Sequence, residues 1–260
     1  MDQSNSSPQP DPSALQAYMD GLGKTTGLSP ALDDASRQSL AQNLATIAAR
    51  PPSGMTIYKY GTRSLVGSYP LEEFGPVVLK YYFPKSLVKR LSYGLLGSRA
   101  ERSWRAAHAF RFVGIPTPAP LFLKERRTLG GLLLDQAFLV TRQAPGIPLS
   151  LWVERHPGEL DRLRRIADAI GSALSIMARH RITHGDLKAS NIIVDSDNAD
   201  AISFIDLDAV EILSTPAAWS AARAKDEKRL LANWRDLPKV FEIFRSVLDR
   251  TGDTPLPEKR

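Results

Sequence analysis

The chain has 260 residues, a length that suits one large domain or two lobes. Of these residues 43% are hydrophobic and 24% are charged, which excludes a fully disordered chain, and none is cysteine. Without cysteine there is no disulfide framework, no thiolate metal site and no cysteine nucleophile. The sequence has no run of 18 apolar residues and no signal-peptide pattern at its start, so we expect a soluble, cytoplasmic protein.

The formal net charge of +6 is concentrated in one segment. Residues 51–130 carry 13 basic and 4 acidic side chains, a net +9, whereas the flanking segments are slightly acidic. A basic segment attracts phosphates, an anionic membrane face or nucleic acid, although a solvated surface has the same composition. No nucleic-acid-binding motif accompanies the charge, so nucleic acid is not an expected partner.

The first 54 residues differ in composition from the rest. The polar, proline-rich beginning predicts a disordered tail and linker over residues 1–28. Gly23-Lys24-Thr25 within it ends like a phosphate-binding loop but lacks the first glycine and a preceding strand. Residues 29–54 predict an N-terminal extension helix with Ser29 as its N-cap and Pro30 in its first turn. Its apolar stripe comprises Leu32, Leu40, Leu44 and Ile47.

Strand patterns dominate the segment 55–144. Residues 55–60, 76–83 and 132–142 predict strands, with Ser, Gly and Pro between them. Residues 98–113 predict one helix, which ends at Gly114-Ile115-Pro116. We therefore expect residues 55–144 to form a small, β-rich N-terminal lobe.

Helix patterns dominate the segment 145–260. Residues 159–180 show apolar side chains at three- and four-residue spacing, as in an amphipathic helix. A polar loop and the short apolar runs 192–194 and 202–205 follow, and the C-terminal part is helical in pattern. Residues 145–260 are therefore predicted to form a short helical C-terminal lobe, and the chain as a whole to be α+β with two lobes.

The polar loop carries the side chains that point to chemistry. It reads His184-Gly185-Asp186-Leu187-Lys188-Ala189-Ser190-Asn191, and Asp206-Leu207-Asp208 follows the next apolar run. Phosphoryl transfer from a nucleotide needs one carboxylate for the acceptor hydroxyl, and an oxygen ligand with a second carboxylate for Mg²⁺. Asp186 is the candidate base, and Asn191 and Asp206 are the candidate metal ligands.

The spacing matches the catalytic loop of protein kinases, H-R-D-x-x-x-x-N. Asp186 and Asn191 keep the five-residue step, but Gly185 replaces the Arg, and Asp206-Leu207-Asp208 replaces D-F-G. Lys188 is a candidate for contact with the transferred phosphate or a solvated residue. Asp208 is a second metal ligand or a structural acceptor, and His184 is expected to support the loop.

Two further residues fit the nucleotide site of a kinase. Val77-Val78-Leu79-Lys80 resembles V-A-I-K, and Glu101 follows 21 residues later in the predicted helix. Lys80 would hold the ATP phosphates and Glu101 would orient it. The glycine-rich loop is replaced by Gly61–Gly67, where Arg63 and Ser64 are candidate phosphate contacts. The nucleotide hinge is expected near residues 142–144.

With these residues the sequence resembles the bacterial lipopolysaccharide kinases, which include the Kdo and heptose kinases of the inner core. The resemblance runs from about residue 55 to residue 240 and includes Gly114-Ile115-Pro116-Thr117-Pro118 after the helix. It implies a protein-kinase-like fold and phosphorylation of a core sugar hydroxyl. It also implies ATP and Mg²⁺ as cofactors and a place at the cytoplasmic face of the inner membrane.

The basic segment agrees with an anionic glycolipid substrate and peripheral contact with that membrane. Its cations alternate with aromatic side chains, which suits a lipid surface, although aromatics in the core and solvated cations are equally compatible. The residues are Lys85, Lys89, Arg90, Arg99, Arg102 and Arg105, with Tyr81, Tyr82, Phe83, Tyr93 and Trp104. A small atypical protein kinase and a pseudokinase that serves as a scaffold are the alternative interpretations.

Overall fold

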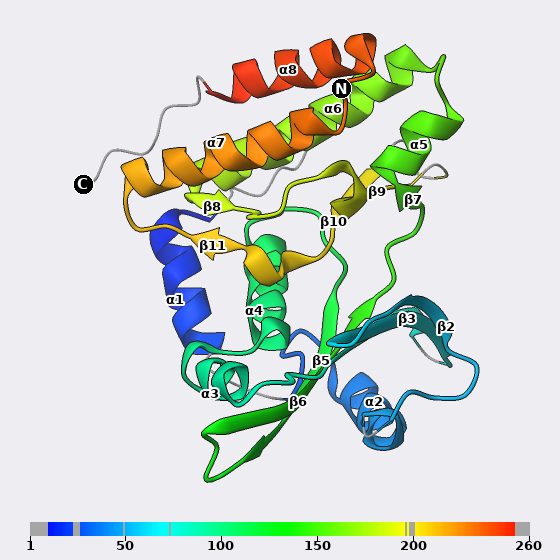
Figure 1. Ribbon diagram of the computed structural model, residues 1–260, viewed down its shortest axis with the longest axis vertical. Helices are drawn as coiled ribbons and strands as arrows, with labels where there is room; N and C mark the ends of the chain where they lie inside the picture. The colour runs from blue at the N-terminus through cyan, green and yellow to red at the C-terminus, as the bar shows by residue number, and fades with distance from the viewer. Residues whose placement is uncertain are drawn as a thin grey trace. The chain divides into compact units, whose positions relative to one another are not determined.

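The computed structural model describes residues 10–22, 27–48, 50–72, 74–195, 197 and 201–252 (Figure 1). The chain divides into two compact units. One unit comprises residues 23–108 and 118–143, and the other comprises residues 1–22, 109–117 and 144–260. Helix and antiparallel sheet are both present, as the α+β prediction requires.

The unit of residues 23–108 and 118–143 is built on a six-stranded antiparallel sheet. The strand order is β1-β5-β6-β4-β3-β2. The strands are β1 (Gly27–Leu28), β2 (Thr56–Tyr60), β3 (Ser64–Leu71), β4 (Gly75–Tyr82), β5 (Pro120–Thr128) and β6 (Leu133–Arg142). Its helices are α2 (Asp34–Ile47), α3 (Leu87–Leu96) and the beginning of α4 (Arg99–Phe112).

Successive residues of β4 point to opposite faces of this sheet. Val77, Leu79 and Tyr81 pack with Leu40, Leu44 and Ile47 of α2, which confirms these three members of the predicted apolar stripe. The fourth member, Leu32, lies before the helix and packs against the same cluster. The opposite face carries a second cluster, in which Tyr82 and Leu139 pack with Ala100 and Trp104 of α4. Helix α2, which the sequence predicted as an N-terminal extension, is therefore part of this unit.

Helices form most of the other unit. They are α1 (Pro12–Leu22), α5 (Leu149–Arg155), α6 (Leu160–Arg179), α7 (Pro216–Ala232) and α8 (Pro238–Gly252), with the 3₁₀ turns η1 (Ala189–Asn191) and η2 (Leu207–Ala209). Helix α6 is buried along Leu163, Ile166 and Ile170, and at Gly171 it approaches Val247 of α8 so closely that a Cβ would collide.

Two small sheets in this unit position the polar loop. The first has the order β10-β9-β7, formed by β7 (Ile147–Pro148), β9 (Ile192–Asp195) and β10 (Ala201–Phe204). The second pairs β8 (Ile182–Thr183) with β11 (Glu211–Ile212). Because β8 precedes the loop and β9 follows it, both ends of the loop are fixed by strand pairing.

The structure corrects several local predictions. Residues 12–22 form α1, with Leu15, Met19 and Leu22 buried, where the sequence predicted a disordered tail. The next helix begins at Asp34, and its cap is Asp33, whose side chain accepts the Ser36 N–H, not the predicted Ser29. Ser29 instead follows β1, where its N–H donates to the Leu121 carbonyl. Strands β3 and β5 and helix α3 were not predicted.

Gly23-Lys24-Thr25 and residues 1–9 of the predicted tail lie outside the described residues. No helix among the described residues combines the length and apolarity that crossing a bilayer requires.

Candidate active site

The loop between β8 and β9 brings three of the predicted site residues together. Lys188 Nζ donates to Asp186 Oδ2 at 2.8 Å. Asn191 Nδ2 donates to the Asp186 carbonyl oxygen at 2.9 Å and to its Oδ2 at 3.2 Å. The carboxylate is thus held by a cation and an amide from its own loop.

These contacts decide the ionisation of Asp186. Partial burial acts to raise the pKa of its carboxyl group. The hydrogen bond and charge of Lys188, with the hydrogen bond of Asn191, outweigh burial and leave that pKa below its usual value. Asp186 is therefore an ionised acceptor at neutral pH.

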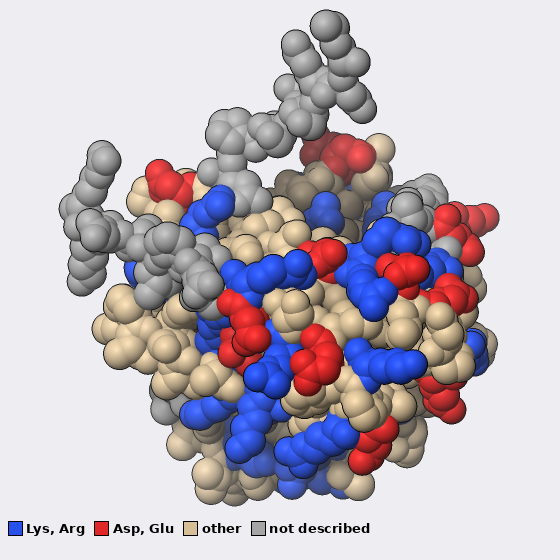
Figure 2. Space-filling view, turned by 90° about the horizontal axis from the view of Figure 1, so that it is seen from above, with Lys and Arg blue, Asp and Glu red and all other residues tan. Residues whose placement is uncertain are grey.

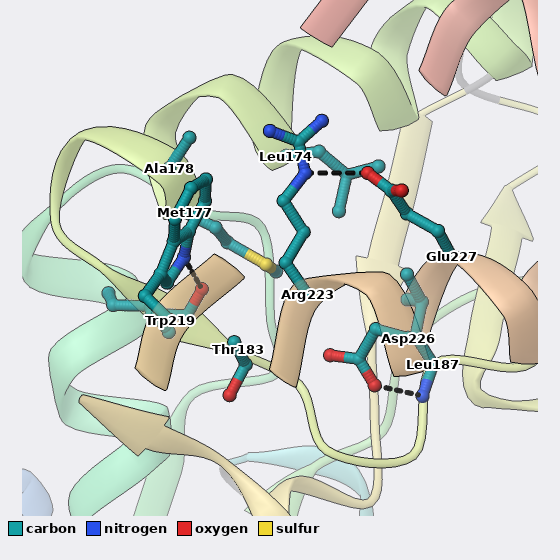
Figure 3. Close-up of a pocket in the computed structure, with 10 residues that line it drawn as sticks. Leu174, Met177, Ala178, Thr183, Leu187, Trp219, Arg223, Asp226 and Glu227 are labelled. Carbon is teal, nitrogen blue, oxygen red and sulfur yellow. Dashed lines mark hydrogen bonds and ion pairs between the residues drawn. The ribbon is translucent and has the colours of Figure 1, made fainter. Parts of the chain in front are cut away.

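The backbone of the loop is fixed by a residue that the sequence analysis missed, Asp226 of α7 (Figure 3). Its Oδ2 accepts the backbone N–H of His184 at 2.8 Å and of Gly185 at 3.0 Å, and its Oδ1 accepts that of Leu187 at 3.3 Å. The carboxylate lies beside a small cavity of about 20 Å³ between α6, β8 and α7.

The sequence contained only a weak signal for Asp226, which could mark the residue but not its partners. Trp219, Asp226 and Leu230 are the buried residues of α7, and their spacing puts them on one helix face. A carboxylate at an apolar-face position of an amphipathic helix is costly unless it has hydrogen-bond partners. Such a residue therefore marks backbone or cationic groups that need an acceptor.

Gly185, where protein kinases carry arginine, is required by the backbone. Its φ is +75°, and a Cβ there would lie 2.1 Å from the carbonyl oxygen of Ala209 in η2. Any side chain would therefore separate the loop from the segment that follows Asp206. The Gly185 carbonyl in turn accepts a hydrogen bond from Arg229 of α7.

Asn191 and Asp206 lie at the same end of the β9–β10 pair. Ile192 and Phe204 form the last pair of that ladder, and the Ile205 N–H continues it by donating to the Asn191 carbonyl at 2.9 Å. Asp206 follows in the left-handed conformation, at φ 61° and ψ 55°. The two predicted metal ligands therefore flank one strand end.

The donor set fits Mg²⁺. The amide nitrogen of Asn191 is engaged by Asp186, so its Oδ1 is the atom left for a cation. An amide oxygen and one or two carboxylates are enough, because Mg²⁺ keeps several of its waters. Among the described residues, no three or more His, Cys, Asp or Glu side chains are grouped so that they could hold a metal ion by themselves.

His184 is fully buried beneath the loop. Its Nε2 lies 3.2 Å from the Ile205 carbonyl oxygen. Burial lowers the pKa of its imidazole, against the opposing influence of Asp226, Asp206 and Asp186. A neutral, buried imidazole suits the structural role expected from the sequence.

The other unit carries Lys80 and Glu101. Lys80 of β4 pairs with Leu139 of β6, so it lies on the sheet face against which α4 packs. Glu101 is in the first turn of α4, and its carboxylate lies 4.0 Å from Arg127 of β5. The predicted strand lysine and helix glutamate therefore belong to the same face of one unit.

Arg63 and Ser64 belong to the same unit but not to an extended loop. Ser64 is the first residue of β3 and is buried, and Arg63 is in the short turn between β2 and β3. This tight hairpin corrects the prediction of a loop over residues 61–67. The expected hinge is where the chain passes from one unit to the other, between Gln143 and Ala144.

Residues 72–238 match the family described as the lipopolysaccharide kinase (Kdo/WaaP) family. The match includes Lys80, Glu101, the loop around Asp186, and Asp206. A search of the curated proteins found no significant match.

Proposed function

Because the chain belongs to the lipopolysaccharide kinase (Kdo/WaaP) family, we propose that it transfers the γ-phosphoryl group of ATP to a sugar hydroxyl of the lipopolysaccharide inner core, on Kdo or heptose. The observation that carries the proposal is the Asp186–Lys188–Asn191 arrangement. An ionised carboxylate held in this way beside a candidate Mg²⁺ site is what phosphoryl transfer to an alcohol requires.

Asp186 has the role of base in the proposed reaction. Its carboxylate orients the acceptor hydroxyl and takes the hydroxyl proton as the new O–P bond forms. The bond from the γ-phosphorus to the bridging oxygen breaks, and ADP leaves with the electron pair. The lowered pKa of Asp186 keeps the base ionised at neutral pH, and Lys188 would neutralise charge on the phosphoryl group.

Asn191 and Asp206 would hold Mg²⁺ through the amide and carboxylate oxygens at the end of the β9–β10 pair. The ion, when bound, supplies charge neutralisation for the phosphates. Asp226 and Gly185 have a different role, because they hold the loop backbone rather than touch a reactant.

In the other unit, Lys80 would bind the nucleotide phosphates, and Glu101 would orient its ammonium group. Arg63 is a further candidate for phosphate contact. Ser64 is a weaker one, because its side chain is buried at the start of β3. With a glycolipid acceptor, the enzyme would act at the cytoplasmic face of the inner membrane.

The test is transfer of labelled γ-phosphate from Mg-ATP to purified core lipopolysaccharide. We expect label in the glycolipid with wild-type protein and with Asp161→Ala, a control at an exposed carboxylate of α6. Asp186→Ala should abolish transfer and retain nucleotide binding. Label on protein alone would favour the protein-kinase alternative. Nucleotide binding without any transfer would favour the scaffold.

A further inference from the structure

A basic cavity lies in the unit of residues 23–108 and 118–143, beside the end of β4. It has a volume of about 250 Å³ and is bounded by the end of β4, by α3 and by the beginning of α4. Its cationic lining residues are Arg63, Lys85, Lys89 and Arg99, and none of the described residues that line it is acidic. Apart from Arg63, which is a candidate contact of the nucleotide phosphates, three basic residues therefore line the cavity.

Two carboxylates lie near the cavity in the sequence but are not among its lining residues. Asp135 of β6 pairs with Arg90 of α3, and Glu101 is the proposed partner of Lys80. The guanidinium of Arg99 stacks over the Tyr82 ring at 5.5 Å from its centroid, which fixes one cation against the cavity wall. Among the described lining residues, an anion in this cavity would therefore meet basic side chains and no acidic ones.

Charged side chains elsewhere on the surface are arranged differently from those that line this cavity. Figure 2 shows acidic and basic side chains interspersed over the face seen from above. Several of the cations in the helical unit have acidic partners, such as Arg250 with Asp168 and Arg223 with Glu227. In the cavity beside β4, by contrast, the charged residues that the structure describes in the lining are all basic.

Helix α3, which forms one side of the cavity, also exposes apolar side chains. Leu87 is 67% exposed, Val88 is 78% exposed and Leu91 is 45% exposed. The three share one helix face, whereas Lys89 lies on the cavity side. Arg90 forms an ion pair with Asp135 of β6 and donates a hydrogen bond to the Leu134 carbonyl. These contacts hold α3 beside the sheet (Figure 1).

More exposed apolar side chains lie in the turn that leads into β6, the strand that α3 contacts. The turn between β5 and β6 carries Leu129, which is 70% exposed, and Leu132, which is 54% exposed. Arg126, close to this turn, is also largely exposed. Exposed leucines beside cations are the composition of surfaces that enter the interface of an anionic bilayer.

We propose that the cavity binds the phosphate group of an anionic membrane lipid while Leu87, Val88 and Leu91 enter the bilayer interface. A soluble anion would account for the cations but not for the apolar face of α3 beside them. The inference adds a defined membrane contact to the proposed function. Its test needs neither nucleotide nor sugar, so the two proposals can fail separately.

The test is co-sedimentation with phosphatidylcholine vesicles with and without phosphatidic acid. We expect the wild-type chain to bind only the vesicles that contain phosphatidic acid. Lys85→Ala/Lys89→Ala should bind about 30-fold more weakly, since each cation at an anionic surface contributes roughly fivefold. Arg235→Ala/Lys239→Ala removes two exposed cations from the other unit and should bind like wild type.

A second variant tests the apolar face. Leu87→Ser/Leu91→Ser leaves every cation in place and should also weaken vesicle binding at least tenfold, with unfolding curves confirming that it folds. Equal binding to both kinds of vesicle, or equal losses in the two cation variants, would overturn the lipid-phosphate site. Binding of soluble glycerol phosphate without vesicle binding would assign the cavity to a free anion and overturn the membrane contact.

Discussion

Removal of the Asp226 carboxylate should loosen the loop that carries Asp186. The side chain is 6% exposed and accepts three backbone N–H groups of the loop. Asp226→Ala leaves these donors without an acceptor and leaves Arg229 without the nearby carboxylate, which lies 3.8 Å away. The variant therefore tests whether one buried carboxylate holds the candidate catalytic loop.

The magnitude follows from the number and kind of hydrogen bonds. A hydrogen bond to a charged group contributes about 1.5–3 kcal/mol, and losing one partner of a buried charged network costs about 3–5 kcal/mol. We expect Asp226→Ala to lower the free energy of unfolding by about 3–5 kcal/mol, a large share of the roughly 5–15 kcal/mol typical of a domain. Asp226→Asn keeps one acceptor and should cost about 1–2 kcal/mol.

Urea denaturation measures these losses, and hydrogen exchange locates them. The amides of His184, Gly185 and Leu187 should exchange faster in Asp226→Asn, and transfer activity should fall with them. Asp161→Asn, at a side chain that is 91% exposed, should change stability by less than about 0.5 kcal/mol. An Asp226→Ala variant as stable as wild type, or unchanged exchange at the three amides, would refute the reasoning.

Three further predictions concern the same unit. Gly185→Ala should lower the free energy of unfolding by at least about 2 kcal/mol more than Gly130→Ala. Both glycines have positive φ, but only at Gly185 would a Cβ collide with backbone, so equal losses in urea denaturation would contradict this. Lys188→Met should raise the pKa of Asp186, so the acid limb of the pH–rate profile should move to higher pH; an unmoved limb would count against their pairing. Burial lowers the pKa of His180, so the unfolded chain binds its proton near pH 6.5 and the folded chain only at lower pH. Stability should therefore fall as the pH drops below about 6.5, and less steeply in His180→Leu, which denaturation at several pH values would measure.

Features set by short-range spacing were predictable from the sequence. The apolar residues of α6 recur at helical spacing, and the helix lies where that pattern placed it, at Leu160–Arg179. Asn191 follows Asp186 by five residues, and within this short loop its amide donates a hydrogen bond to the Asp186 carboxylate. Such contacts lie within a few residues, so the sequence alone specifies them.

Pairing over long distances decided the rest. Strand β5 has the polar sequence Lys124–Arg127 in its second half, so no alternating pattern marked it, yet β6 pairs with it along its length. Leu15, Met19 and Leu22 of α1 are buried only because other parts of the chain cover them. Asp226 lies 40 residues beyond Asp186, and only the packing of α7 brings its carboxylate under the loop. The residues of the candidate site can thus be identified from their spacing in the sequence. The residues that hold the loop in place cannot, because hydrogen bonds between distant segments follow no fixed spacing along the chain.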